Sequence, residues 1–442
     1  MKPRILVVDD DPGVRYTLRE ILETADTEVF EVEDGLAALA WLGHERADLV
    51  ITDLRMPRLD GMKLLEQIGA LPDRPKVIVL TAHGSERHAV EAMKLGAWDY
   101  FAKPFDADVV LGGVERAVAS VRRDQENERL RAELLLSRHM VFASEAMRKL
   151  ALLVYRIAPR DVTVLITGPS GSGKERLAEA VVAGSPRAGH PFVRMNCAAV
   201  PAELAEAELF GHTRGAFTGA IKARPGLFRE ADSGSLLLDE VGELSLGTQG
   251  KLLRALQERR VRPIGEEREV EVDVRLLCAT NRDLKQEVVA GRFREELYYR
   301  INVVELRISP LVERPDDIPL LVDHFLGIYT EHFGTGPLVV PAKIRQALVH
   351  GAYQGNVREL EHTIERMVAL SSGGVVDEIS LESSPSQQAP TAFGLKERVD
   401  AFERGILAKE LRETGGNRSE AARRLGIGRV TLLDKMKKYG LE

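Results

Sequence analysis

Over residues 1–120, short apolar runs alternate with longer segments in which apolar residues recur every three or four positions. This alternation predicts strands separated by amphipathic helices, an arrangement typical of a doubly wound α/β domain with a parallel sheet. The runs that we interpret as strands are Ile5–Val8, Val29–Val32, Leu49–Thr52, Val77–Thr81 and Tyr100–Phe101.

From Asp108 to about Leu136 the pattern is that of one continuous helix. Two interpretations fit its apolar residues: a seam between two copies of the chain, or a face that packs on the chain's own N-terminal domain. The residues at three-four spacing are Leu111, Val114, Val118 and Val121. Gln125 and Glu128 interrupt this pattern, and we expect the charged stretch around them to be exposed to solvent.

A second α/β region begins with the apolar run 162–166, which is followed by Gly168-Pro-Ser-Gly-Ser-Gly-Lys174-Glu175. We interpret this stretch as a buried strand, a glycine loop and a helix that begins at Lys174. Backbone N–H groups of such a loop, the helix dipole and the lysine together attract phosphate. Glu175 stands where a hydroxyl residue usually follows the lysine. The expected ATP contacts are Gly168, Ser170, Gly171, Gly173, Lys174 and Glu175.

The apolar run 235–238 ends in two acids, Asp239 and Glu240. A carboxylate at a strand end can bind magnesium, and a neighbouring one can activate water, so we assign Asp239 to Mg2+ and Glu240 to catalysis. A strand that ends in a solvated acidic turn is the alternative. Because the glycine loop lies upstream, the pair favours an ATPase that uses ATP and Mg2+.

In the N-terminal domain, polar residues follow the ends of several expected strands. Ligands of doubly wound sheets bind beyond the carboxyl ends of the strands, where Asp9, Asp10 and Asp53 should meet. Three carboxylates repel one another unless a cation lies among them, which predicts a divalent metal site. Asp53 is placed to accept a phosphoryl group, and Thr81 and Lys103 to bind its oxygens. A single acid there would simply be solvated.

Composition limits the remaining functions. The 442 residues carry a net charge of −7 and are 44% hydrophobic, so a nucleic-acid-binding function must be local. Two cysteines, Cys197 and Cys278, are too few for a disulfide framework and are expected at buried strand ends. Neither a membrane-spanning run nor a signal peptide is apparent, so we expect a cytoplasmic protein without membrane contact.

The C-terminal part contrasts with the acidic whole. After a Ser-, Pro- and Gln-rich linker, helical patterns cover residues 395–413, 419–425 and 429–439, with glycine turns between them. From Gly415 on, the sequence contains seven basic and three acidic residues. Helix, glycine turn and helix with local basic charge predict DNA binding; a basic bundle for protein contact is the alternative. The candidate DNA contacts are Arg418, Arg424, Arg429, Thr431 and Lys435.

The set of acids, with Asp53-Leu-Arg-Met-Pro57 and Lys103-Pro104, resembles the flavodoxin-like receiver domain of bacterial two-component response regulators. The resemblance implies that Asp53 takes phosphate from a cognate sensor histidine kinase. It also implies that Thr81 and Tyr100 form the switch pair that relays phosphorylation.

Residues 142–381 resemble the AAA+ domain of NtrC-type activators of sigma-54 RNA polymerase. The most specific motif is Gly215-Ala216-Phe217-Thr218-Gly219-Ala220, which the resemblance identifies as the loop that contacts sigma-54. Asn196, in Phe192-Val-Arg-Met-Asn196, would restrain Glu240. Asn281 and Arg358 would be the first and second sensors of the nucleotide phosphates. Tyr353-Gln354 departs from the family's Trp-Pro, which leaves the packing of the lid in question.

Arg294 and Arg300, in Phe293-Arg-Glu-Glu-Leu-Tyr-Tyr-Arg300, match a segment with arginine fingers, and the resemblance does not distinguish between them. Fingers that act on a neighbouring subunit imply a homo-oligomer, for which the family expectation is an inactive dimer and an active hexameric ring. The C-terminus resembles the Fis-type helix-turn-helix module, which binds enhancer double-stranded DNA as a dimer. Asp434 stands where a basic residue is common in that module.

The resulting hypothesis is a phosphorylation-controlled, ATP-hydrolysing activator of sigma-54 RNA polymerase. Two alternatives are a DNA-binding regulator that acts by recruitment or occlusion, and an AAA+ remodelling enzyme outside transcription. Whether the receiver restrains ring assembly or promotes it is left open by the motifs. The expected segments are a receiver (1–120), a helical linker (121–140), an α/β ATPase subdomain (141–308), a helical lid (309–381), a flexible linker (382–394) and an all-α helix-turn-helix domain (395–442).

Overall fold

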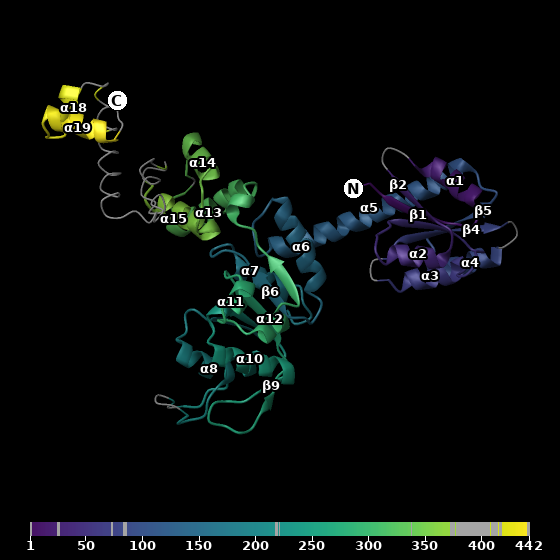
Figure 1. Cartoon of the computed structure of the whole chain (residues 1–442), viewed down its shortest axis with the longest axis horizontal. Helices are drawn as coiled ribbons and strands as arrows, with labels where there is room; N and C mark the ends of the chain where they lie inside the picture. Colours follow the sequence, from purple (N-terminus) through teal and green to yellow (C-terminus); the bar gives the residue numbers. More distant parts are fainter. Residues whose placement is uncertain are drawn as a thin grey trace. The chain divides into compact units, whose positions relative to one another are not determined.

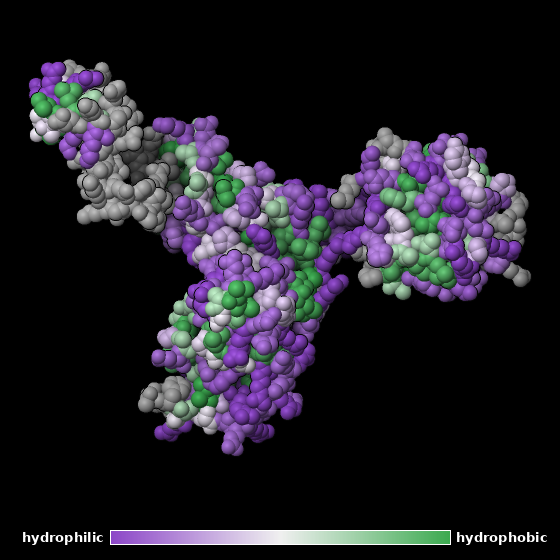
Figure 2. All heavy atoms as spheres, in the orientation of Figure 1, coloured by the Kyte–Doolittle hydropathy of each residue, from purple (hydrophilic) through white to green (hydrophobic). Residues whose placement is uncertain are grey.

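The computed structural model describes residues 2–23, 27–71, 74–82, 86–216, 220, 222–336, 338–371, 376, 407, 414 and 418–439 (Figure 1). The chain divides into two compact units. One comprises Met1–His324 with Gly355–Arg358, and the other comprises Phe325–Gln354 with Glu359–Glu442. Much of the visible surface is hydrophilic, with smaller hydrophobic areas between (Figure 2).

The N-terminal sheet is parallel, with strand order β2-β1-β3-β4-β5, as the sequence pattern predicts for a doubly wound fold. Alternate residues of β1 face opposite sides: Ile5 packs with α1 and α5, whereas Leu6 packs with α2, α3 and α4. The five expected strands are confirmed. Their bounds are β1 Arg4–Val8, β2 Glu28–Val32, β3 Leu49–Asp53, β4 Lys76–Ala82 and β5 Asp99–Lys103, and the helices between them are α1 Pro12–Leu22, α2 Gly35–Leu42, α3 Gly61–Gly69 and α4 Glu86–Lys94.

Helix α5 (Ala107–Ser137) is continuous, as expected. In its first half, Val114 is only 4% exposed in the core of the N-terminal domain, and Val118 packs against the same core. The interpretation that this half packs on its own domain is therefore confirmed for these two residues, and a seam between copies stays a prediction. Near its end, Ala132 and Leu136 are buried beside α6 (Glu145–Ile157) in the core of the next domain.

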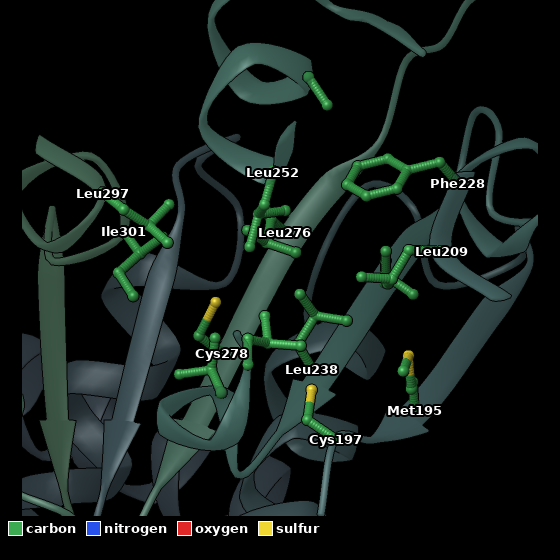
Figure 3. Packing of buried hydrophobic residues seen from close by; sticks show 14 of the residues in the cluster. Met195, Cys197, Leu209, Phe228, Leu238, Leu252, Leu276, Cys278, Leu297 and Ile301 are labelled. Atoms are coloured by element: carbon green, nitrogen blue, oxygen red, sulfur yellow. The ribbon is translucent and has the colours of Figure 1, made fainter. Parts of the chain in front are cut away.

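The second sheet is also parallel, with order β12-β6-β11-β8-β7. Helices α5, α6 and α7 cover one face, and α8, α9, α10 and α12 cover the other. On the second face Cys197 and Cys278 are buried and unpaired, as expected (Figure 3). The bounds are β6 Val164–Thr167, β7 Phe192–Asn196, β8 Ser235–Asp239, β11 Arg275–Thr280, β12 Val304–Arg307, α7 Lys174–Ala183, α8 Ala202–Phe210, α9 Leu227–Glu230, α10 Leu246–Glu258, α11 Leu284–Val289 and α12 Glu295–Ile301.

Short elements complete this domain. The 3-10 turns are η1 (Val241–Glu243) and η2 (Leu311–Glu313), and β9 (Arg260–Val261) pairs antiparallel with β10 (Val270–Glu271). The expected helical lid begins after η2 and contains α13 (Asp317–Phe333), α14 (Ala342–Val349) and α15 (Asn356–Ala369).

At the C-terminus, α18 (Arg418–Arg424) and α19 (Arg429–Tyr439) confirm the second and third expected helices. Ala421 and Ala422 of α18 pack against Leu432 and Met436 of α19. The flexible linker 382–394 and most of the first expected helix, 395–413, lie outside the described residues. Among the described residues, no helix is long and apolar enough to cross a membrane.

Candidate phosphoacceptor and nucleotide sites

The three predicted acids of the N-terminal domain meet at the carboxyl ends of β1 and β3. One carboxylate oxygen from each of Asp9, Asp10 and Asp53 lies within 4.8 Å of the others. Lys103, from the end of β5, places its Nζ 2.7 Å from Asp9 Oδ2 and 3.1 Å from Asp53 Oδ2. The sequence-predicted cluster is therefore assembled, with the lysine as its cationic member.

Charge in this cluster is unbalanced. Burial raises the pKa of Asp9, and its bonds to Lys103 and to the Asp11 N–H offset part of that rise. Burial acts to lower the pKa of Lys103, but its hydrogen bonds to Asp9 and Asp53 leave it raised. The cluster contains three carboxylates and one ammonium, so it carries an excess of negative charge. This charge and the closely spaced carboxylate oxygens fit the binding of Mg2+.

The backbone of Asp53 is held closely from one side. A Cβ on Gly61, the first residue of α3, would lie 2.1 Å from the Asp53 carbonyl oxygen, so only glycine fits there. Sequence reasoning missed Gly61, and its only signal is the Asp60-Gly61 pair that opens the helix. The close approach fixes the position of Asp53 at the end of β3.

The two expected switch residues lie on neighbouring strands. Thr81 is 3% exposed on β4, whereas Tyr100 on β5 is 46% exposed. In the strand register Tyr100 is the partner of Val79, and Thr81 is the partner of Ala102. The tyrosine ring is thus turned toward solvent, and the switch role of the pair stays a prediction.

The glycine loop has the expected form between β6 and α7. Gly171 and Gly173 have φ values of 74° and 102°, which side chains disfavour, and Gly173 caps α7. Lys174 is 7% exposed, and its Nζ donates to the Gly168 and Pro169 carbonyls at 3.2 and 3.4 Å. The Lys174 ammonium is therefore held against the first residues of the glycine loop that precedes it.

The acidic pair lies at the end of β8, beside the neighbouring strand ends. Glu240 Oε1 is 3.4 Å from Lys174 Nζ, and Glu240 Oε2 accepts a hydrogen bond from the Asn281 N–H at 3.1 Å. Burial and the adjacent Glu240 charge raise the pKa of Asp239. The negative charge of its carboxylate is thus poorly compensated, and a bound cation would compensate it. A cavity of about 530 Å³ beside this group is lined by Gly168, Pro169 and Asn281, among others.

Asn196 ends β7, one strand away from the acidic pair. Its Oδ1 accepts from the Ala198 and Ala199 N–H groups at 2.9 and 3.3 Å. The expected pair with Glu240 would use the amide nitrogen instead, and it stays a prediction.

The remaining nucleotide residues have different surroundings. Glu175 Oε1 bonds to Arg194 Nη1 at 2.9 Å, and the same nitrogen bonds to Glu179. Sequence reasoning missed Arg194, whose only signal is a polar position in β7 two residues before Asn196. Arg358 is exposed at the start of α15, and its N–H donates to the Gly171 carbonyl at 3.3 Å. The main-chain N–H groups of the two expected sensors therefore contact the site: that of Arg358 binds the glycine loop, and that of Asn281 binds Glu240.

The two candidate arginine fingers are exposed: Arg294 is the residue that precedes the short helix α12, and Arg300 lies near the end of that helix. Arg294 Nε donates to the Leu246 carbonyl, and Arg300 Nη2 donates to the Leu256 carbonyl, both at the surface of α10. These bonds orient the two guanidinium groups through main-chain carbonyls, which do not neutralise their charge. In the second unit, Tyr353, which stands where the family has Trp, donates its hydroxyl to the Leu348 carbonyl at 2.6 Å.

The neck of the expected sigma-54 loop is closed. Gly215 has a φ of 82°, and its N–H donates to the Ala220 carbonyl at 2.8 Å. His212, below the neck, forms bridges with Arg224 and Ile264. Ala216 is described and Ala220 is buried, but Phe217, Thr218 and Gly219 lie outside the described residues.

In the C-terminal pair of helices, Arg429, Val430 and Thr431 are exposed in the first turn of α19. Arg418 is exposed at the start of α18, and Lys435 is half-buried on α19. Arg424 lies 3.6 Å from Glu420 of its own helix, so its charge is partly neutralised. Two of the predicted DNA contacts, Arg429 and Thr431, are therefore accessible, and their contact with DNA stays a prediction.

Comparison with known families covers nearly the whole chain. Residues 5–115 match the response regulator receiver domain, and 140–307 match the sigma-54 interaction domain. Residues 312–397 match the AAA+ ATPase lid domain, and 398–439 match the Fis family of bacterial regulatory proteins.

Full-length relatives agree with these matches. The chain is 43% identical to the transcriptional regulatory protein ZraR of Salmonella typhi, with 98% of each chain covered. It is 39% identical to the regulatory protein AtoC of Escherichia coli K12, covering 99% of this chain and 98% of AtoC. The crystal structure of NtrX from Brucella abortus aligns over 100% of both chains, with 33% identity and a TM-score of 0.55. The chain therefore belongs to the NtrC-type sigma-54-dependent response regulators.

Proposed function

We propose that this response regulator is phosphorylated on Asp53 and hydrolyses ATP to activate sigma-54 RNA polymerase. The observation that carries the proposal is the convergence of Lys174, at the start of α7, with Glu240 and Asn281, which follow the adjacent strands β8 and β11. Such an arrangement puts a phosphate-binding cation, a base and a sensor around one point. NtrX has been solved in complex with ATP and with ADP, which supports nucleotide binding at the equivalent loop.

At the ATP site, each side chain has a distinct role. The loop N–H groups and Lys174 bind the phosphates, and Glu240 accepts a proton from the attacking water. Asn281 and Arg358 contact the terminal phosphate, and Arg294 or Arg300 of a neighbouring subunit stabilises the charge that develops on it. The active form is accordingly a ring, with a hexamer as the expected stoichiometry and a dimer as the inactive form.

At the receiver site, a carboxylate oxygen of Asp53 attacks the phosphorus of the phosphorylated histidine of a sensor kinase. The P–O bond forms as the P–N bond breaks and the imidazole leaves, and Lys103 and Thr81 bind the transferred phosphoryl oxygens. Asp9, Asp10 and Asp53 would hold one Mg2+, and Asp239 would hold another at the ATP site. When bound, Mg2+ supplies positive charge that offsets the charge of the phosphoryl oxygens.

The output has two contacts. The loop 215–220 presents Phe217 and Thr218 to sigma-54, and the exposed first turn of α19 binds enhancer DNA through Arg429 and Thr431. The hydrogen bond from the Gly215 N–H to the Ala220 carbonyl supports the first contact, because it holds the two ends of the loop side by side.

The decisive experiment is transcription in vitro with purified sigma-54 polymerase and an enhancer-bearing promoter. We expect open complexes to form only when the protein is phosphorylated and ATP can be hydrolysed; a non-hydrolysable analogue should not support them. Control of transcription that is independent of ATP would reject this proposal and favour recruitment or occlusion.

A further inference from the structure

Two carbonyl groups of the glycine loop are held by side chains from outside the loop. Asn356 Nδ2, at the start of α15, donates to the Ser170 carbonyl at 3.1 Å. Arg314 Nη2, between η2 and α13, donates to the Ser172 carbonyl at 3.2 Å. Both side chains are buried, with exposed fractions of 3% and 1%. Neither residue belongs to the sites assigned above.

These two bonds determine where the next N–H groups point. In a planar trans peptide the C=O and the following N–H point in opposite directions. Because the Ser170 and Ser172 carbonyls are turned toward Asn356 and Arg314, the N–H groups of Gly171 and Gly173 are turned away from them. Neither N–H donates to an acceptor within the described chain. Both are therefore free to meet an anion on the open side of the loop.

The two side chains are themselves fixed. Asn356 has a φ of 56°, which asparagine tolerates, and its Oδ1 accepts from the Leu311 N–H at 2.8 Å. Arg314 Nη1 lies 3.4 Å from Asp317 Oδ2. Asp317 Oδ1 in turn accepts from the Ala143 and Ser144 N–H groups at 2.6 and 2.7 Å. This bracing network joins the segment before α6, the loop and the start of the lid.

The energetics argue that the network has a function beyond filling space. Arg314 and Asp317 are both almost fully buried, and a buried ion pair is often no more stable than apolar residues of similar volume. Methionine or leucine would fill the Arg314 position without desolvating a charge. Unlike an apolar side chain, the Arg314 guanidinium can hold the Ser172 carbonyl in a given direction.

We propose that Arg314 and Asn356 are positioning residues that preorganise the Gly171 and Gly173 N–H groups for the phosphates of a nucleoside di- or triphosphate. This inference rests on the proposed function of the loop as the ATP site. Preorganised donors contribute affinity because the loop does not have to be ordered when the ligand binds. Asp317 acts through Arg314 by fixing its orientation.

The test uses full-length Arg314→Met and Asn356→Gly. Glycine keeps the left-handed backbone of position 356 while removing the amide. We expect each variant to bind a fluorescent ADP analogue about tenfold more weakly than the wild type. The KM for ATP should rise by a similar factor, whereas kcat should change much less, because neither side chain contacts the reacting atoms. Arg314→Lys, which keeps one cationic donor, should recover part of the affinity.

The matched control is Arg275→Met. Arg275 is 3% exposed, and its guanidinium also binds main-chain carbonyls, those of Ile157, Ala158 and Val162, at the opposite end of the sheet from the loop. We expect it to lower the thermal midpoint, as Arg314→Met does, without changing ADP affinity. Thermal midpoints of all variants separate loss of stability from loss of binding.

The outcomes are distinct. Unchanged ADP affinity in Asn356→Gly and Arg314→Met would overturn the inference and leave the ATP site intact. An equal loss of affinity in Arg275→Met would also overturn it, because the effect would then be general destabilisation. If Arg314→Met does not fold, Asn356→Gly decides by itself. Absence of nucleotide binding in the wild type would reject the proposed function together with this inference.

Discussion

The carboxylate of Glu240 accepts a hydrogen bond from the main-chain N–H of Asn281, 3.1 Å away. The donor is a backbone group at the end of β11, so the contact depends on strand pairing rather than on the asparagine side chain. It leaves the Asn281 amide available for a phosphate, while the other oxygen of Glu240 remains beside Lys174. The base and the sensor are thus linked through the sheet itself.

Glu240→Gln should separate binding from hydrolysis. The amide is nearly isosteric and can still accept from the Asn281 N–H, but it cannot accept a proton from water. We expect kcat for ATP to fall by about a hundredfold or more, which is the usual contribution of a general base, with ADP affinity within about threefold of the wild type.

Glu243→Gln is the matched control for Glu240→Gln, because Glu243 lies in the adjacent η1 turn and pairs with Arg282 away from Lys174. Its turnover should be near normal. Normal turnover in Glu240→Gln would assign the base to another residue.

The sequence was sufficient for features that follow from strand order. Asp9 and Asp53 were predicted to meet because parallel strands place their carboxyl ends along one edge. Asp239 was predicted separately, from the acidic pair that ends an apolar run of the second sheet. Asn196 lies at the corresponding edge of the second sheet, and its contact with Glu240 stays a prediction. The position of a residue at the edge follows from the hydrophobic pattern, whereas the partner of its side chain depends on tertiary neighbours, which for Glu240 are Lys174 and the Asn281 N–H.

Residues that act through tertiary contact left little trace in the sequence. Gly61 is required because α3 begins against the Asp53 carbonyl, and Arg314 falls within the expected lid with no sequence signal of its contact with the glycine loop. Helix α5 shows the same limit: three-four spacing predicts an apolar face, but only the structure shows that Val114 covers its own domain. The hydrophobic pattern predicts that a helix forms and which of its faces is apolar. What this face contacts depends on the elements that pack beside the helix.

Asp53→Asn should abolish phosphorylation by a sensor kinase or a small-molecule phosphodonor. Asparagine retains the acceptor for the Leu54 N–H, which Asp53 Oδ1 binds at 2.8 Å, so the fold should be kept. Phosphorylation can be measured by the mobility shift in a phosphate-affinity gel. Asp60→Asn is the control, because Asp60 caps α3 through the Lys63 N–H and asparagine caps equally well. A normal shift in Asp53→Asn would place the phosphoacceptor elsewhere.

The ion pair between Glu128 on α5 and Arg156 on α6 should contribute stability that depends on pH. The two side chains form two bonds at 2.9 and 3.1 Å, and hydrogen bonding to Arg156 lowers the pKa of Glu128. A carboxylate whose pKa is lowered by folding stabilises the fold above its unfolded pKa of about 4.3. The contribution is lost as the pH falls through the lower, folded pKa.

Glu128→Gln tests this linkage by urea unfolding between pH 7 and pH 4. At pH 7 we expect a loss of at most about 1 kcal/mol, because the pair is partly exposed, and the difference from wild type should shrink toward pH 4. Glu126→Gln is the control, since Glu126 pairs only at 3.4 Å with Arg129 of its own helix. A difference that stays constant with pH would show that the charge of Glu128 is not involved.

Phe217→Ala should uncouple ATP hydrolysis from activation. The Gly215–Ala220 bond closes the neck of the loop, and the ATP-site residues lie on other elements, so truncation at the tip should leave both unchanged. We expect the ATPase rate to stay within about twofold of wild type while sigma-54-dependent open-complex formation falls by about tenfold or more, as for an aromatic contact residue. Phe217→Tyr keeps the ring and should retain most activation. If Phe217→Ala still opens promoters at the wild-type rate, the tip does not transmit the energy of hydrolysis, and the sigma-54 contact must lie elsewhere on this domain.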